Sequence, residues 1–173
     1  MIVIGIDGGL KGGIVALYGH SVQRWVMPTV GTGQRVYDLR ALTLILSCCC
    51  SHDSPRPFAF IERAQAMPKQ GVSSSFKIGF GFGALQGVVT ALDIPYEVVS
   101  PQTWQRTMFE GINRSDTKAA SVLVAQRQQP TIDWRATPRC KNAHDGLTDA
   151  YCIAAWGMRQ LAARQLQEGT AAE

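Results

Sequence analysis

Residues 2–9 constrain the fold more than any other segment, because they carry an acidic side chain at the end of a mostly apolar run. Val and Ile favour β-strands, and a near-continuous apolar run is typical of a strand that is buried on both faces. An unpaired charge is costly in such a strand. Asp7 is therefore either held there for chemistry or opens a turn with Gly8 and Gly9. In the first case the two glycines leave room beside the carboxylate for a metal ion or a phosphate.

Length and composition indicate a single globular domain. The chain has 173 residues, of which 46% are hydrophobic and 17% are charged, so it can form a core and is too apolar for a disordered chain. We predict one domain over residues 1–167 and a disordered tail over residues 168–173. The formal net charge of +4 is compatible with binding to nucleic acid but does not establish it.

Neither a membrane nor an oxidising compartment is expected. No apolar run approaches the ~20 residues that span a bilayer, and no secretory leader precedes the first strand. The five cysteines include Cys48, Cys49 and Cys50, which are consecutive, so their side chains point in different directions and cannot easily converge on a zinc ion. We therefore predict free thiols and a cytoplasmic protein.

The order of the predicted elements indicates the fold class. Apolar and alternating runs predict strands at residues 2–7, 14–18, 22–27, 58–61 and 94–99. Helical spacing predicts helices at residues 36–50, 76–92, 101–109, 115–128 and 144–167, with Ser115 as the N-cap of the fourth. Short turns join the first three strands into an antiparallel meander. We therefore expect an α/β fold with a mixed five-stranded sheet, three antiparallel strands followed by two parallel ones, flanked by helices.

Four acidic residues stand out from this pattern: Asp7, Glu62, Asp145 and Asp149. Glu62 ends an apolar strand as Asp7 does, so the two acids would lie side by side if their strands were neighbours. Asp145 and Asp149 are four residues apart and share a helix face, which Cys152 and Trp156 continue, nearly opposite the apolar stripe of that helix. Crowded carboxylates repel one another and raise their pKa values, a conflict that two Mg²⁺ or Mn²⁺ ions would remove. The alternative is that all four are ordinary surface acids, with the helical pair complementing the helix dipole.

Three motifs in this order resemble the RuvC-type Holliday junction resolvases of the ribonuclease H-like superfamily. They are Gly5-Ile6-Asp7 with its following glycines, Ile61-Glu62, and His144-Asp145-x-x-x-Asp149-Ala150. The spacing of four in the last motif, together with Phe80-Gly81-Phe82-Gly83, is closer to the chloroplast-type and phage members than to ordinary bacterial ones. The short chain without a transit peptide favours a phage or bacterial origin.

The resemblance implies a homodimer that cuts two opposed strands of a four-way DNA junction. It implies that the four acids are the catalytic, metal-binding positions and that Lys118 is a catalytic residue near the scissile phosphate. The alternative is that Lys118 is an ordinary solvated lysine on a helix. His144 either assists the leaving group, orients a ligand or has a structural role. Alternative functions are those of a ribonuclease H-like nuclease for RNA–DNA hybrids or single strands, and of a junction-binding protein that does not cleave.

Basic, polar and large apolar residues are expected to contact DNA. They are Arg63, Met67, Lys69, Gln70, Phe76, Lys77, Arg114 and Lys141. A helix predicted from Phe76 to Leu92 carries four glycines, which are costly in a helix interior but allow another backbone to come close. By the resemblance this helix forms the dimer interface, and simple core packing is the alternative.

Overall fold

The structure is a computed structural model, which describes residues 1–50, 55–65 and 71–170. The main sheet contains β1 (Ile2–Asp7), β2 (Gly13–Tyr18), β3 (Ser21–Val26), β6 (Pro57–Glu62) and β7 (Tyr96–Val99). A separate two-stranded ribbon contains β4 (Thr29–Val30) and β5 (Val36–Tyr37). The helices are α1 (Leu39–Cys48), α2 (Val72–Ala91), α3 (Pro101–Met108), α4 (Thr117–Gln128) and α5 (Asp145–Thr170).

The strand pairing confirms the predicted sheet. The strand order is β3-β2-β1-β6-β7. The pairs β1–β2 and β2–β3 are antiparallel, and the pairs β1–β6 and β6–β7 are parallel. The fold is therefore an α/β fold of the ribonuclease H-like type, and β1, whose end carries Asp7, lies at the centre of the sheet.

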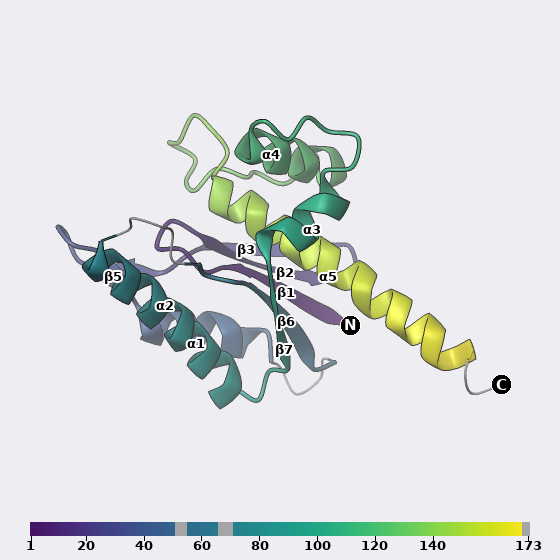
Figure 1. Cartoon of the computed structure of the whole chain (residues 1–173), viewed down its shortest axis with the longest axis horizontal. Helices are drawn as coiled ribbons and strands as arrows, with labels where there is room; N and C mark the ends of the chain where they lie inside the picture. Colours follow the sequence, from purple (N-terminus) through teal and green to yellow (C-terminus); the bar gives the residue numbers. More distant parts are fainter. Residues whose placement is uncertain (51–54, 66–70, 171–173) are drawn as a thin grey trace.

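Helices cover the two faces of the sheet separately (Figure 1). α1 and α2 lie on one face, and α5 crosses the other with α3 and α4 beyond it. Side chains alternate between the faces of a strand, so Ile2, Ile4 and Ile6 pack towards α1 and α2 while Val3 packs towards α5. The same alternation directs Asp7 to the α5 face.

Glycines allow α5 to lie very close to the sheet. A Cβ atom on Gly5 would lie 2.1 Å from the carbonyl oxygen of Ala150, and one on Gly146 would lie 2.5 Å from the Cα of Gly12. Any side chain at these positions would push the helix away from β1 and from the turn that follows it. The glycines of the first strand and turn therefore set the depth at which the start of α5 docks.

The region around α1 differs from the prediction. The sequence predicts a helix over residues 36–50, but Val36 pairs with Val30 in the β4–β5 ribbon. The helix begins only at Leu39, because the side chain of Asp38 accepts a hydrogen bond from the Ala41 amide at 2.9 Å and caps it. Two-residue strands leave too short a pattern to recognise in a sequence.

Three other helices differ in their boundaries. α2 begins at Val72 rather than at Phe76, and α5 continues to Thr170, three residues past its predicted end. The N-cap of α4 is Asp116 and not Ser115, because the Asp116 carboxylate accepts hydrogen bonds from the amides of residues 118 and 119, at 3.0 and 3.1 Å. An ionised carboxylate is a stronger acceptor at a helix N-terminus than a hydroxyl.

The predicted two-sided character of α5 is wrong. The sequence predicts Cys152 and Trp156 on a face opposite the apolar stripe, yet they are only 0% and 7% exposed. α5 contacts β1, β2 and β6 on one side and α3 and α4 on the other, so both faces are buried. All five cysteines are free, as predicted. Within the part of the chain that the structure describes, no helix has the length and apolar character needed to cross a bilayer.

Candidate active site

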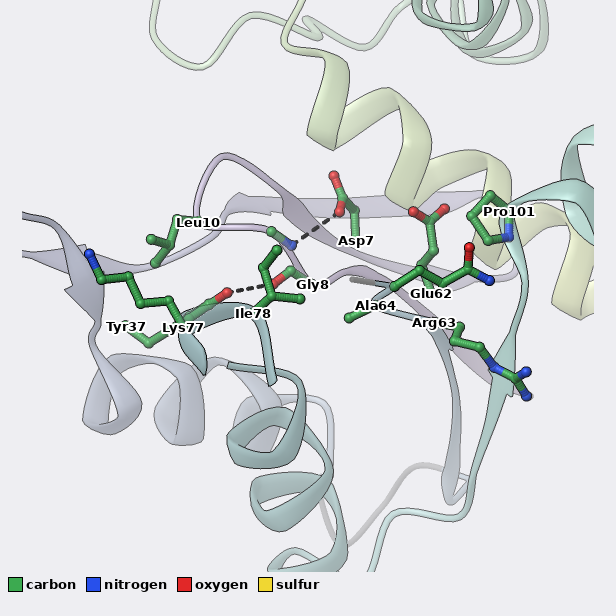
Figure 2. A pocket seen from close by; sticks show the side chains of 12 residues that line it. Asp7, Gly8, Leu10, Tyr37, Glu62, Arg63, Ala64, Lys77, Ile78 and Pro101 are labelled. Carbon is green, nitrogen blue, oxygen red and sulfur yellow. Dashed lines mark hydrogen bonds between the residues drawn. The ribbon is translucent and has the colours of Figure 1, made fainter. Parts of the chain in front are cut away.

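Asp7 and Glu62 lie together at one edge of the sheet. In the parallel pair of β1 and β6, Ile6 is opposite Ile61, and an acid follows each of them. Both acids lie an even number of residues from a side chain that packs on the α5 face, Val3 in β1 and Phe60 in β6, so they project from that same face. Their carboxylates point the same way, towards α5 (Figure 2). The prediction that the two strand-end acids are neighbours is therefore correct.

The first turns of α5 add Asp149 to this pair. Close packing of Gly146 on the turn after β1 brings the start of the helix against the sheet edge. Asp149 is near enough to act electrostatically on Glu62, and Asp7 acts on both of them. Three partly buried carboxylates from β1, β6 and α5 thus share one region.

Burial raises the pKa of all three, and repulsion from a neighbouring carboxylate adds to it in each case. Burial is the larger cause in each case. It raises the pKa of Glu62 to about 7, with Asp7 and Asp149 adding to the effect. It also raises the pKa of Asp149 to about 7, with Asp7 and Asp145 as further causes. The pKa of Asp7 is raised by burial as well, against the opposing hydrogen bond from the Gly9 amide to its Oδ1 at 3.2 Å.

Asp145 behaves differently from the other three acids. The Nζ of Lys118 in α4 lies 2.8 Å from its Oδ2. This ion pair holds the pKa of Asp145 below its ordinary value. The structure therefore brings Lys118 to the site, where it pairs with the more exposed of the two helical acids.

Solved structures share this architecture at low sequence identity. No family model and no curated protein sequence matches the chain. Thermus thermophilus RuvC matches with a TM-score of 0.55 and 20% identity, over 92% of this chain and 96% of RuvC. The chain has the RuvC fold.

Two further structures with this fold are of proteins that act on, or are bound to, Holliday junctions. T. thermophilus RuvC in complex with a Holliday junction substrate matches with a TM-score of 0.57 and 17% identity, over 92% of this chain and 96% of that one. The yeast mitochondrial Holliday junction resolvase Ydc2 matches with the same TM-score and identity, over 92% of this chain and 78% of its own.

On this RuvC fold, a cavity of about 420 Å³ opens beside the two strand-end acids. Arg63 and Lys77, both predicted to contact DNA, are exposed and line it. In Figure 2 the Arg63 guanidinium lies away from the carboxylates, and Lys77 lies at the far end beside Tyr37. Phe76, which is 73% exposed, lines a smaller apolar cavity that shares Lys77 with the first.

The remaining predicted DNA contacts lie away from this cavity or outside the described residues. Arg114 donates a hydrogen bond to the carbonyl of Arg106 at 3.0 Å. Lys141 is exposed and lines a separate cavity near residues 130–143. Met67, Lys69 and Gln70 fall in residues 66–70, outside the described residues.

His144 helps to begin α5. Its Nδ1 accepts a hydrogen bond from the Leu147 amide at 3.3 Å, and its own amide donates to the Trp134 carbonyl at 2.8 Å. The same Leu147 amide also donates to the His144 carbonyl at 3.0 Å, so His144 pairs an amide of the first turn with both its ring and its backbone. The structure gives His144 the structural role that the sequence left open, and its auxiliary role in chemistry stays a prediction.

Two aromatic residues hold the acidic edge in place and were not predicted. The indole Nε1 of Trp104 in α3 donates to Oε2 of Glu62 at 2.8 Å. The hydroxyl of Tyr37 in β5 donates to the carbonyl of Gly8 at 2.8 Å (Figure 2). The Tyr37 ring packs against Gly81 in α2, in the space that a side chain at position 81 would fill. A lone tryptophan in the polar segment of α3 signals burial, but nothing in the sequence reveals its partner.

The donor set suits a hard divalent cation, but the acids do not form a ready-made cage. Carboxylate oxygens are the ligands that Mg²⁺ and Mn²⁺ prefer, and a cation would relieve the repulsion that raises the three pKa values. Among residues 1–50, 55–65 and 71–170, however, no group of three or more His, Cys, Asp or Glu side chains is close enough to hold a metal ion. The predicted acids therefore lie in one region, but no three of them are close enough to bind one metal ion together.

Proposed function

We propose that this protein is a structure-selective endodeoxyribonuclease that resolves four-way DNA junctions by metal-dependent hydrolysis of phosphodiesters. The observation that supports this most strongly is the meeting of Asp7, Glu62 and Asp149 at one sheet edge, with Lys118 beside them. The fold adds support, because a RuvC bound to a Holliday junction substrate and a mitochondrial Holliday junction resolvase share it.

The four acids would hold Mg²⁺ or Mn²⁺, with two ions per site. Bound between carboxylates, such ions stabilise the attacking water and the leaving oxygen of a phosphodiester. Lys118 supplies a positive charge on the open side of the site, where its ammonium group is largely exposed and can reach a DNA phosphate. The further role of Asp145 in this scheme is to keep that lysine at the site until substrate arrives.

DNA would approach from the side on which the cavity opens. Arg63 and Lys77 place positive charge on its rim, and the exposed ring of Phe76 can contact unpaired bases at a junction. Arg114 and Lys141 would contact further phosphates. Lys69 and Gln70 would hydrogen-bond phosphates or base edges, and Met67 would wedge against bases at an opened junction.

Paired cutting requires two sites, and α2 is the proposed contact between two copies. Gly79, Gly83 and Gly87 follow one another at intervals of four and have open space beyond their Cα atoms. Phe80, which is 55% exposed, flanks them. Glycines at this spacing allow two helices to approach closely, so sedimentation should give a dimer at micromolar concentration, and a monomer under those conditions would contradict paired cutting. The four-residue spacing of Asp145 and Asp149 supports a place among the chloroplast-type and phage resolvases. The proposed location is the cytoplasm.

A cleavage assay that compares substrates tests the proposal. Wild-type protein in Mg²⁺ should cut a four-way junction faster than duplex DNA, single strands or an RNA–DNA hybrid. Asp7→Asn should bind the junction as wild type does and not cut it, while Asp133→Asn, which changes an acid outside the site, should cut normally. Preferred cutting of the hybrid or single strand would identify another ribonuclease H-like nuclease, and binding without cutting by wild type would identify a junction-binding protein.

A further inference from the structure

We infer that Trp104 is a positioning residue that fixes the orientation of the Glu62 carboxylate within the acidic site. The inference rests on the proposed function and deepens it, because it names a residue outside the acidic set that this site needs. The contact itself is direct, since the Trp104 indole Nε1 donates to Glu62 Oε2 at 2.8 Å. An indole N–H can only donate a hydrogen bond, so the Glu62 carboxylate oxygen is the acceptor in this contact.

The tryptophan is held firmly enough to act as an anchor. Its side chain is 0% exposed, and its ring packs edge-on against Phe109 with centroids 5.4 Å apart. It belongs to the core on the α5 face of the sheet. Its helix is also fixed at its start, where Ser100 accepts a hydrogen bond from the Thr103 amide at 3.3 Å and Pro101 occupies the first turn.

The chain connection places this anchor beside β6. The strand β7 ends at Val99, α3 begins at Pro101, and the Arg63 amide donates to the Val99 carbonyl at 2.8 Å. Trp104, in the helix that follows β7, therefore reaches Glu62 from the β7 side of β6, whereas Asp7 lies on β1 at the other side. Two hydrogen bonds thus connect the end of β6, which carries Glu62, to the end of β7 and to α3.

Glu62 needs such an anchor more than the aspartates do. Its side chain is longer and more flexible, and Asp7 and Asp149 both repel its charge. The hydrogen bond holds Oε2 against that repulsion and leaves Oε1 free of the indole. Asp7 has a comparable partner in the Gly9 amide and Asp145 in Lys118, so each of these acids has a partner that is not itself an acid.

The chain offers a matched control for a test of this role. Trp134 is also buried, at 3% exposed, and its Nε1 has no hydrogen-bond partner among the residues that the structure describes. Trp104→Phe and Trp134→Phe remove the same atoms from two buried tryptophans, but only the first removes a bond to a site carboxylate. Thermal unfolding of both variants measures the shared cost of the lost ring.

Mn²⁺ binding without DNA is the first measurement, followed by junction binding and cleavage. Outer partners of metal ligands typically affect metal affinity or activity ~10–100-fold. Trp104→Phe should therefore weaken Mn²⁺ binding and lower kcat by at least ~10-fold, with the Kd for the junction unchanged, while Trp134→Phe changes neither. In the Glu62→Ala background, which removes the acceptor of the indole N–H, Trp104→Phe should add no further loss, as expected of two residues that act as one unit.

Equal Mn²⁺ affinities in the two phenylalanine variants, or an additive loss in the Glu62→Ala background, would overturn the inference. If Trp104→Phe does not fold, NMR of otherwise unaltered protein gives the same answer: Glu62→Ala should shift the indole N–H signal of Trp104 and speed its exchange with solvent. An unchanged signal refutes the contact. A wild-type protein that binds Mn²⁺ but cuts no junction would end the proposed function and leave the comparison of metal affinities valid.

Discussion

The carboxyl group of Asp149 is expected to destabilise the fold that holds it. Asp149→Asn keeps the size and polarity of the side chain and removes its charge. In metal-free buffer at pH 8 we expect the variant to be more stable than wild type, even though it should lose cleavage. The reason is that burial, together with Asp7 and Asp145, opposes the ionised form of Asp149 in the folded state.

The magnitude follows from the pKa. Burial raises the pKa of Asp149 from 3.8 to about 7, and each pKa unit corresponds to ~1.4 kcal/mol. Well below the unfolded pKa the group is protonated in both states and contributes nothing. Between the unfolded and the folded pKa it ionises only when unfolded, so the free energy of unfolding of wild type falls as pH rises, by up to ~4 kcal/mol, and then stays level. Asn abolishes this fall, and we expect a gain of ~2–4 kcal/mol at about pH 8.

Urea unfolding at pH 4, 6 and 8 in EDTA measures the effect. The two proteins should differ little at pH 4 and most at pH 8. Asp133→Asn is the control of opposite sign, because Arg135 lowers the pKa of Asp133 to about 2 and its ionised form favours the fold; that variant should lose stability rather than gain it. Equal stability of Asp149→Asn and wild type at pH 8 would refute the assignment of Asp149 to a crowded, partly buried site.

Two further predictions concern the docking of α5 and the ion pair at its start. Gly5→Ala should cost ~1–3 kcal/mol in urea unfolding, because its Cβ would meet the carbonyl oxygen of Ala150 at 2.1 Å, whereas Gly169→Ala, at the exposed end of α5 with open space beside it, should cost nothing; the same loss at both positions would contradict the close packing. Lys118→Met should raise the pKa of Asp145 towards its ordinary value in an NMR titration and slow cleavage, and an unchanged Asp145 titration would exclude the ion pair in solution.

The sheet and its acids could be predicted from the sequence for a physical reason. Strand periodicity and the position of an acid at the end of an apolar run are local signals, so the sequence alone reveals Asp7 and Glu62 as acids at strand ends. The parallel pairing of β1 and β6 then makes them neighbours. The spacing of Asp145 and Asp149 indicates their common helix in the same way. Lys118 required the family resemblance, because a single lysine on a helix carries no local signal of its partner.

The features that the sequence did not predict depend on contacts between distant segments. Trp104 and Glu62 are joined by the arrangement of β6, β7 and α3, and Tyr37 lies on a two-residue strand whose partner is equally short. The burial of both faces of α5 arises because α3 and α4 cover a helix that already lies on the sheet. Hydrophobic periodicity reports one buried face and is weak where both faces are covered.

The position of α5 between the sheet and two other helices has a consequence for when the protein can act. Asp7 comes from β1 and Asp149 from α5, two elements that are far apart in the sequence and contact each other in the folded protein. A nascent, clipped or partly unfolded molecule therefore carries the acids but not the site. A nuclease of the proposed kind would thus be harmless to surrounding DNA until its own folding is complete, without any inhibitor to keep it so.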